Sequence, residues 1–400
     1  MRSTLALATQ LLTAMTASAA ASSGQRVLYI QDNDPTGNSI VSIKVSQNGS
    51  LSGGVKTSTG GNGYPVLIVP SQDSVVVSGN YLFTVNSGSN TLSLFNINPW
   101  DPLHPKLIGK PAPTLGHVPV SVTYSEKLKT ACVVNGGLDL AGVTCFSVDP
   151  KKGLQPLGPM RTILQTKDFT PPPAGTPPTI LTGDIRFNPS STGVFTTAAN
   201  ETGGPGVLYA YPVVSGSVST TPVVTKFDNV VNPFSLNFLN SDSQLFMTNP
   251  HNESPGAALL TISPSLAVTE TKIVTIPHQN ASCWAAYAPI YDTIFVMDAA
   301  AAVVSTVDIS KESVVSQFDF QSANFGPTDT LVDRNFLYFI TEPFNDDFSA
   351  FLASPQVLVY DITSVSKGKN PQLIQSFDIF KAVGSFPDIM GLAIYAPQDE

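Results

Sequence analysis

The chain has 400 residues, of which 42% are hydrophobic and 12% are charged, so its composition is that of a packed globular protein and not of a disordered one. Its length permits one large domain or two ordinary ones. Its formal net charge of −9 disfavours nucleic-acid binding, because phosphates would be repelled, and no cluster of Lys and Arg counters this charge.

The N-terminus has the features of a secretory signal. Arg2 provides a positive start, residues 5–12 form a short and mainly apolar run, and Ala-Ser-Ala at 17–19 fits a small-x-small cleavage site. The apolar run is shorter than the roughly 20 residues that span a bilayer, so no membrane span is expected. We predict that residues 1–19 are a signal peptide and that the mature protein is secreted to the extracellular space or the cell wall.

After this signal the chain repeats one pattern of strands. A central strand recurs about every 50 residues, within the range of about 40 to 50 that is typical of a propeller blade. A third strand follows each copy, for example SIVSIKV after the first and TLSLFNI after the second. The central strands are VLYIQD (27–32), YLFTVN (81–86), TACVVN (130–135), GVFTTA (193–198), QLFMTN (244–249), TIFVMD (293–298) and LYFITE (337–342).

A first strand precedes six of the seven copies, and the exception predicts how the ring closes. The first copy begins directly after the signal and has no preceding strand, whereas DIMGLAIYAP at 388–397 has first-strand character and nothing follows it. We expect this last strand to supply the inner strand of the N-terminal blade, which leaves only short, protected sheet edges. The sequence therefore predicts an all-β fold, a single seven-bladed β-propeller over residues 25–400.

Two insertions interrupt the repeat. TPPPAGTPPT at 170–179 cannot be a central strand, because proline lacks the ladder donor, and we interpret it as a stiff excursion between the third and fourth blades. A linker between domains is the weaker alternative, because the repeat continues beyond it. EPFNDDFSAFLASPQ at 342–356 is predicted to be a long loop of the last blade, and loops on a propeller face commonly carry binding.

The three cysteines divide into a pair and a single residue. Cys132 and Cys145 lie on consecutive predicted strands, and an oxidising compartment would allow them to form a disulfide. We predict this bond, with two buried thiols as the alternative. Cys283 would then be unpaired, and beside Trp284 we interpret it as a small buried residue in preference to a reactive thiol.

Four glycosylation sequons agree with export, since each falls in a predicted loop or turn where an acceptor can be reached. Together with the signal they predict a glycoprotein. The acceptor residues are Asn48, Asn200, Asn252 and Asn280.

The blade pattern resembles that of a known superfamily. PVSVTYSEKLKTACVVNGG followed by GVTCFSV resembles blades of the seven-bladed lactonase-like propellers, which include bacterial 6-phosphogluconolactonase-like proteins and fungal 3-carboxymuconate cyclases. DNDPTGNSIVSIKVSQNGSLSGGVKTSTGG and VVVSGNYLFTVNSGSNTLSLFNI look closer still to secreted fungal glycoproteins carried under the name 3-carboxymuconate cyclase. The resemblance covers essentially the whole mature chain.

The resemblance implies a reaction that forms or opens a lactone, by an isomerase or a hydrolase, on a small acidic substrate that needs cations and a proton donor. Asn200 and Glu201 match an Asn-Glu pair of the active relatives. Gly183 and Asp184 stand where those relatives carry a histidine-bearing signature, and this chain lacks those histidines. Arg186, two residues after Asp184, is the best single cation for an acidic substrate, with a structural ion pair as the alternative.

Polar residues at the N-terminal ends of the inner strands are candidates for a central site. Four aspartates from different blades could converge on a divalent cation, Ca²⁺ or Mg²⁺, which prefers oxygen ligands. The alternative is that they accept hydrogen bonds from strand-end amides and bind water. These aspartates are Asp73, Asp184, Asp329 and Asp388, and Ser121 and Ser235 are offered at equivalent positions.

Two histidines are candidates for acid-base work. His117 and His278 precede the inner strands of the third and sixth blades by similar distances, and histidine titrates near neutral pH. The alternative is that each is an ordinary polar loop residue. With Arg186 and Glu201 they make up the predicted catalytic set.

Two functions of different classes therefore stay open. One is a lactonising or lactone-hydrolysing enzyme with its site at the funnel mouth, and the other is a noncatalytic glycoprotein that binds a glycan or a host surface. The fold does not decide between them. We expect a monomer in either case.

Overall fold

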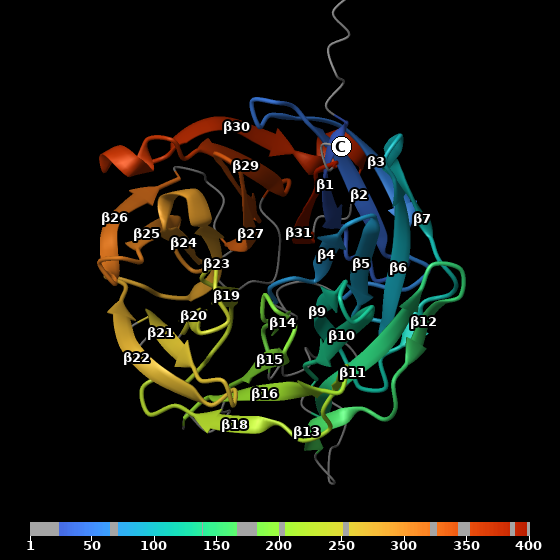
Figure 1. Ribbon diagram of the computed structural model, residues 1–400. Coiled ribbons are helices and arrows are strands. Elements are labelled where there is room, and N and C mark those ends of the chain that lie inside the picture. The colour runs from blue at the N-terminus through green and yellow to red at the C-terminus, as the bar shows by residue number, and fades with distance from the viewer. Residues whose placement is uncertain are drawn as a thin grey trace, which may run out of the picture.

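The computed structural model describes residues 24–64, 71–137, 139–165, 182–199, 205–250, 256–320, 326–342, 353–384 and 389–397. These residues form seven antiparallel sheets arranged around one axis (Figure 1). The predicted seven-bladed β-propeller is confirmed. Among the described residues, no helix has the length and apolarity needed to cross a bilayer.

The first three blades each have an inner strand at the axis followed by strands that step outward. Blade 1 contains β31 (Met390–Tyr395), β1 (Arg26–Gln31), β2 (Ser39–Val45) and β3 (Leu51–Ser58). Blade 2 contains β4 (Val75–Ser78), β5 (Tyr81–Asn86), β6 (Thr91–Asn98), β7 (Asp101–Leu107) and β8 (Ala112–Pro113). Blade 3 contains β9 (Pro119–Ser125), β10 (Thr130–Asn135), β11 (Leu140–Asp149), β12 (Gly153–Pro156) and β13 (Arg161–Gln165).

The other four blades repeat this plan. Blade 4 contains β14 (Ile185–Phe187), β15 (Gly193–Ala198), β16 (Val207–Val214), β17 (Ser217–Val218) and β18 (Val223–Lys226). Blade 5 contains β19 (Leu236–Phe238), β20 (Gln244–Thr248), β21 (Gly256–Ile262) and β22 (Val268–Thr275). Blade 6 contains β23 (Ser282–Ala288), β24 (Thr293–Asp298), β25 (Val303–Asp308) and β26 (Ser313–Asp319). Blade 7 contains β27 (Pro327–Asp333), β28 (Phe336–Thr341), β29 (Gln356–Asp361) and β30 (Gln372–Asp378).

Helices are short and peripheral. The described residues contain the 3₁₀ turns η2 (Pro289–Tyr291) and η3 (Val365–Lys367) and the five-residue helix α1 (Ile379–Val383).

The hydrophobic core lies between neighbouring blades. Each major cluster joins residues of two adjacent sheets, as between blades 2 and 3, where Phe83 packs with Val133 and Phe146. The central strands β1, β10, β15 and β24 are buried along their whole length. Because both of their faces pack against other blades, these strands need apolar or small residues at nearly every position, which explains their unbroken apolar runs in the sequence.

The ring closes as predicted. β31 pairs antiparallel with β1, with Tyr29 opposite Ala393, and it occupies the inner position of blade 1 (Figure 1). The side chains of Leu392 and Tyr395 are buried in the clusters that join blade 1 to its two neighbours.

The predicted disulfide is also confirmed. Cys132 on β10 and Cys145 on β11 are directly opposite in the strand register, with Cα atoms 4.0 Å apart, and they are bonded to each other. Both are buried in the cluster between blades 3 and 4. Cys283 is a free thiol packed beside Trp284 in the cluster between blades 6 and 7, and burial raises its pKa, which argues against a reactive thiolate.

Candidate functional site

The segment immediately before β4 reaches across the propeller axis. The Gln72 backbone N–H donates to the Gly183 carbonyl of blade 4, at 2.8 Å. The indole Nε1 of Trp284 in blade 6 donates to the Ser71 carbonyl, at 2.6 Å. Ser71–Asp73 precedes blade 2, whereas blades 4 and 6 lie on the other side of the axis. The segment therefore lies over the centre of the ring and closes the channel at the N-terminal ends of the inner strands.

The Gln72 side chain extends this crossing to a further blade. Its Nε2 donates to Asp329 Oδ1 in blade 7, at 3.2 Å, and its Oε1 accepts from the Ala285 backbone N–H in blade 6, at 3.4 Å. The residue is 2% exposed. Since a buried amide without partners is costly, these bonds define where the segment sits. Gln72 therefore places Asp73, its neighbour in the chain, beside the inner strand of blade 4.

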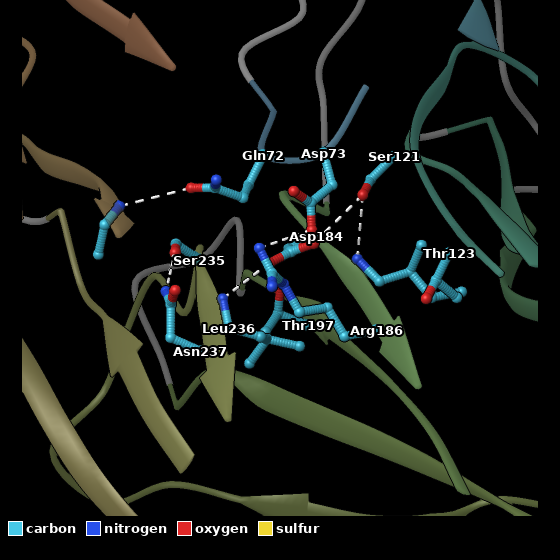
Figure 2. A network of polar contacts seen from close by, with 12 residues as sticks. Gln72, Asp73, Ser121, Thr123, Asp184, Arg186, Thr197, Ser235, Leu236 and Asn237 are labelled. Atoms are coloured by element: carbon cyan, nitrogen blue, oxygen red, sulfur yellow. Dashed lines mark hydrogen bonds and ion pairs between the residues drawn. The ribbon is translucent and has the colours of Figure 1, made fainter. Parts of the chain in front are cut away.

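Asp73, Arg186 and Asp184 form an ion-pair triad at this point (Figure 2). Arg186 Nη2 lies 2.7 Å from Asp73 Oδ2, and its Nε lies 3.4 Å from Asp184 Oδ2. Asp184 also accepts from the Leu236 backbone N–H at 2.8 Å and from Ser121 Oγ at 3.2 Å. That Arg186 follows Asp184 by two residues and could form an ion pair was visible in the sequence, whereas the contact with Asp73 arises only from the fold.

Burial sets the charge state of the triad. Burial first, and then the charge of Asp73, raises the pKa of Asp184 to about 7, although Arg186 opposes the shift. Burial by itself would lower the Arg186 pKa, but the charges of Asp73 and Asp184 outweigh it and raise that pKa above its usual value. The guanidinium therefore stays charged, while Asp184 binds a proton near neutral pH.

Asp73 and Arg186 of the triad form part of the floor of a cavity of about 550 Å³ along the axis. Gln72, Asp73 and Arg186 line its deep end, and all seven inner strands contribute to its walls. Its lining continues to Pro189 and Asn240, which follow the C-terminal ends of β14 and β19, so the mouth lies on that face. The Arg186 side chain is 29% exposed, and it lines this cavity.

The walls are suited to hydrogen bonding. Each inner strand pairs within its own blade on one side only, so its other edge presents backbone N–H and C=O groups toward the axis. Thr123, Asn237 and Thr330 add polar side chains, and Tyr124 and Tyr287 add aromatic ones. Arg186 is the single cationic residue among the described residues that line the cavity.

The two candidate histidines do not line the cavity in which Arg186 lies. His117 precedes β9, its Nδ1 contacts a carboxylate oxygen of Asp139, and its side chain is 48% exposed. His278 is exposed in the turn before β23, with φ +57°. Neither residue lines the cavity, because both precede their inner strands at the end of the channel that Ser71–Asp73 closes.

The described aspartates do not fit a divalent cation. Asp73 and Asp184 already hold the Arg186 guanidinium, whose charge would repel a metal ion placed between them. Asp329 accepts from the backbone N–H groups of Thr330 and Leu392, at 2.7 and 3.0 Å, as the alternative interpretation expected. Within the described part of the chain, no three His, Cys, Asp or Glu residues are grouped so that they could hold a metal.

Several predicted residues cannot be placed. Glu201, Asp388, Asn200 and Asn252 lie outside the described residues, as does the proline-rich stretch at 170–179. Of the other two acceptors, Asn48 is exposed in the turn between β2 and β3, and Asn280 is exposed before β23, so both are accessible.

Three residues that line the cavity were not predicted from the sequence, namely Gln72, Tyr124 and Tyr287. Gln72 stands in no motif, and only its position next to Asp73 could have suggested it. The tyrosines sit in ordinary inner-strand patterns, where nothing in the sequence separates a residue that faces the cavity from one that packs between blades.

No known family profile and no curated protein matches this chain. Solved structures do resemble it. A Lactobacillus plantarum protein shares 16% identity with a TM-score of 0.63, covering 93% of this chain and 98% of its own. A candidate 6-phosphogluconolactonase from Bacteroides fragilis shares 12% identity with a TM-score of 0.63, covering 94% and 99%. The periplasmic gluconolactonase of Pseudomonas aeruginosa shares 15% identity with a TM-score of 0.62, covering 93% and 99%.

At these identities the likeness shows a shared fold, the seven-bladed propeller of proteins that carry lactonase names. The resemblance to the fungal 3-carboxymuconate cyclase group remains a prediction.

Proposed function

We propose that this protein is a secreted, lactonase-like propeller that hydrolyses a small, uncharged and hydroxylated lactone in its central cavity. The observation that carries the proposal is the pairing of Arg186 with Asp73, at 2.7 Å, on the floor of a cavity of about 550 Å³. A guanidinium can polarise a carbonyl and a carboxylate can activate water, which are the two needs of lactone opening. The lactonase names of proteins with this fold support the same reaction class.

The charges of the floor favour an uncharged substrate over the acidic one expected from the resemblance. Arg186 is the single cation among the described lining residues, and its charge is already paired with the Asp73 carboxylate. A phosphorylated or tricarboxylate substrate would meet the Asp73 carboxylate at the floor and would find no unpaired cation to bind it in a bidentate manner. Neutral hydroxyl groups, in contrast, can exchange hydrogen bonds with the strand edges of the walls.

The proposed reaction uses one water molecule and returns the enzyme unchanged. The Asp73 carboxylate accepts a proton from water as the water oxygen attacks the lactone carbonyl carbon. The Arg186 N–H groups donate to the oxyanion that forms. The C–O bond of the ring then breaks, and the proton held by Asp73 passes to the departing ring oxygen, giving a hydroxy acid. Burial raises the pKa of Asp73, with Arg186 opposing the rise, and a raised pKa makes the carboxylate a better base.

Asp184 is a positioning residue in this scheme. It holds the Nε edge of Arg186, and Leu236 and Ser121 hold Asp184 in turn. The Nη2 group of Arg186 is thereby held toward Asp73 at the cavity floor.

Export of the protein is part of the proposal. The disulfide between Cys132 and Cys145 is consistent with an oxidising compartment, as are the predicted signal at 1–19 and the accessible sequons at Asn48 and Asn280. A glycoprotein is expected to lose mass on treatment with an endoglycosidase.

A second candidate function is binding without turnover. Neither His117 nor His278 lines the cavity, and the charge of Arg186 is neutralised in the structure. A cavity with these properties could hold a hydroxylated ligand, such as a glycan end, without reacting with it.

Lactone hydrolysis can be measured by titrating the acid that it releases. Glucono-1,5-lactone is expected to be hydrolysed faster than its spontaneous rate and with a higher kcat/KM than its 6-phosphate. Arg186→Met and Asp73→Asn should each lower kcat by about 100-fold or more, the usual loss when an oxyanion donor or a general base is removed. Arg334→Met, at an exposed arginine outside the cavity, is the matched control and should retain activity.

A rate equal to the spontaneous one for every lactone would exclude the enzyme. Saturable binding of the same lactones would then identify the noncatalytic function.

A further inference from the structure

Three adjacent inner strands give one side of the central cavity an aliphatic lining. Blades 7, 1 and 2 are neighbours because β31 closes the ring, and each presents two consecutive aliphatic residues to the cavity. These pairs are equivalent in the strand register, because each lies opposite a Leu and the aromatic residue that follows it in the central strand. We call the six residues the aliphatic wall: Leu331, Val332, Ala393, Ile394, Val76 and Val77.

The aliphatic wall is continuous, because its side chains fill the gaps between the three strands. Leu331 and Ile394 both pack against the hydrophobic cluster that joins blade 7 to blade 1. Val77 packs against the cluster that joins blade 1 to blade 2, which contains Ala393. The side chains therefore form one apolar surface that spans three blades.

This surface is uncovered toward the mouth of the cavity. Val77, Val332 and Ile394 are each only half-buried. Two residues deeper, on the same faces of the same strands, the side chains are packed, and the residues there are at most 5% exposed, namely Val75, Thr330 and Leu392. Apolar area that is left in contact with water inside a cavity favours an apolar group that covers it.

The opposite side of the cavity carries the polar groups. At the register position that Leu331 occupies in blade 7, blades 3, 4 and 5 carry Thr123, Arg186 and Asn237. At the depth of Arg186 the cavity is therefore polar on one side and aliphatic on the other.

The polar side chains that β27 and β4 add to the lining are already engaged. Thr330 Oγ1 donates to the Tyr338 carbonyl at 3.0 Å, and Ser78 Oγ donates to Glu126 Oε1 at 3.0 Å. Among the described lining residues, no charged side chain comes from β27, β31 or β4. This side of the cavity thus selects an apolar group.

We propose that the aliphatic wall binds an alkyl chain of the substrate, so that the substrate is an amphiphilic lactone. Its ring would lie at Arg186 with hydroxyl groups toward Thr123 and Asn237, and its alkyl chain would follow blades 7, 1 and 2 to the mouth. A cavity of about 550 Å³ is of the size that holds such a ligand. This inference rests on the proposed function, whose substrate it specifies.

Binding of lactams, which share the shape of lactones but resist hydrolysis, tests the wall apart from turnover. Isothermal titration calorimetry would compare the 6-O-methyl, 6-O-butyl and 6-O-hexyl ethers of glucono-1,5-lactam. Affinity is expected to rise with chain length, and the hexyl ether should bind at least about tenfold more tightly than the methyl ether. That gain requires the burial of only about two of the five added methylene groups.

A variant that makes the wall polar without changing its shape locates this gain. The triple variant Val76→Thr, Val77→Thr and Val332→Thr should bring the affinities for the methyl and hexyl ethers to within about threefold of each other. The matched control makes the same three exchanges at exposed valines outside the cavity and should keep the full gain. Its positions are Val214, Val224 and Val315. Circular dichroism and thermal unfolding would check that both triple variants are folded.

Equal affinity for the three ethers in the unchanged protein, binding of none of them, or binding of several hexyl ethers per chain would each overturn the proposal. So would a gain that persists in the cavity variant or is lost in the control. Hydrolysis of the corresponding lactones is measured separately. If the hexyl lactam is preferred but no lactone is hydrolysed, the alkyl site stands and the hydrolytic function fails. If lactones are hydrolysed without a preference for the chain, the function stands and the alkyl site fails.

Discussion

Arg186 is held from two sides by carboxylates that belong to different blades. Asp184 lies two residues before Arg186, immediately before β14, and Asp73 belongs to the segment before β4. A buried charge is tolerated only when it is paired and hydrogen-bonded, and the Asp184 carboxylate accepts two further bonds. Burial disfavours the charged form of Asp184 most strongly, because its side chain is the most deeply buried of the three, at 0% exposed.

The raised pKa of Asp184 predicts how the free energy of unfolding depends on pH. The pKa of Asp184 is about 7 in the folded protein, against about 3.9 for an unperturbed aspartate. Between about pH 4 and pH 7 the unfolded chain has released this proton while the folded protein retains it, so stability falls as the pH rises. Burial raises the pKa of Asp329 as well, and its effect has the same sign.

Asp184→Asn should flatten this dependence, because an amide does not titrate. Urea unfolding at pH 5 and pH 8 is expected to show a smaller loss of unfolding free energy in the variant than in the unchanged protein. Asp228→Asn, at an exposed loop position, serves as the control and should keep the original slope. An unchanged slope in Asp184→Asn would show that Asp184 ionises normally and would contradict the assigned proton.

At the scale of elements, Ser71–Asp73 differs from the repeating strands. It pairs with no ladder of its own and is held by isolated hydrogen bonds, one each to blades 3, 4 and 7 and two to blade 6. Because it lies across the axis, one end of the channel becomes a floor, and the seven inner strands then enclose a one-ended cavity. The disulfide between β10 and β11, in contrast, reinforces a pairing that the strand ladder already makes.

Gln72→Ala is expected to destabilise the protein through the partners that it leaves behind. Loss of the side chain deprives the buried Ala285 N–H of its acceptor and Asp329 of one donor. An unsatisfied buried polar group costs about 1–3 kcal/mol, so the free energy of unfolding in urea should fall by about that amount. Gln155→Ala, at an exposed position of β12, should change it by less than about 0.5 kcal/mol. Equal unfolding midpoints for the two variants would mean that Gln72 does not anchor the crossing.

At the scale of the whole molecule, stability depends on closing the ring. β31 covers the edge of β1 and places Leu392 and Tyr395 in the clusters of blade 1. Gly24 and Pro397 lie together, since a Cβ at Gly24 would come within 2.6 Å of Pro397 Cγ. The two ends of the described chain are therefore neighbours in one blade.

Deleting the residues from 388 onward should abolish cooperative folding. The loss of burial at four or so side chains is on the order of 5 kcal/mol, which is comparable with the total stability of a typical domain. A circular permutant that links 397 to 24 and opens the exposed turn between Ser310 and Lys311 should instead retain cooperative thermal unfolding. A truncated chain as stable as the full one would show that β31 does not close the ring.

Much of the fold could be predicted from the sequence, because its signals are local and repeated. Strands buried on both faces require runs such as TACVVN and TIFVMD, and the missing first strand of blade 1 pointed to the end of the chain. Opposite residues of a hairpin are also local, which is why Cys132 and Cys145 could be paired. The adjacency of Asp184 and Arg186 followed from their spacing along one strand.

The rest of the site was decided by tertiary structure. Asp73 meets Arg186 only because a segment without any motif crosses the axis, and the second cavity, lined by residues 123–127 and 187–191, exists only because two distant turns lie side by side. His117 and His278 each precede an inner strand, and from the sequence both were predicted to reach the channel. The crossing segment, however, separates their end of the channel from the cavity. Local patterning determines which strands form and which faces are buried, whereas the position of a charge relative to a cavity depends on contacts between parts of the chain that share no local signal.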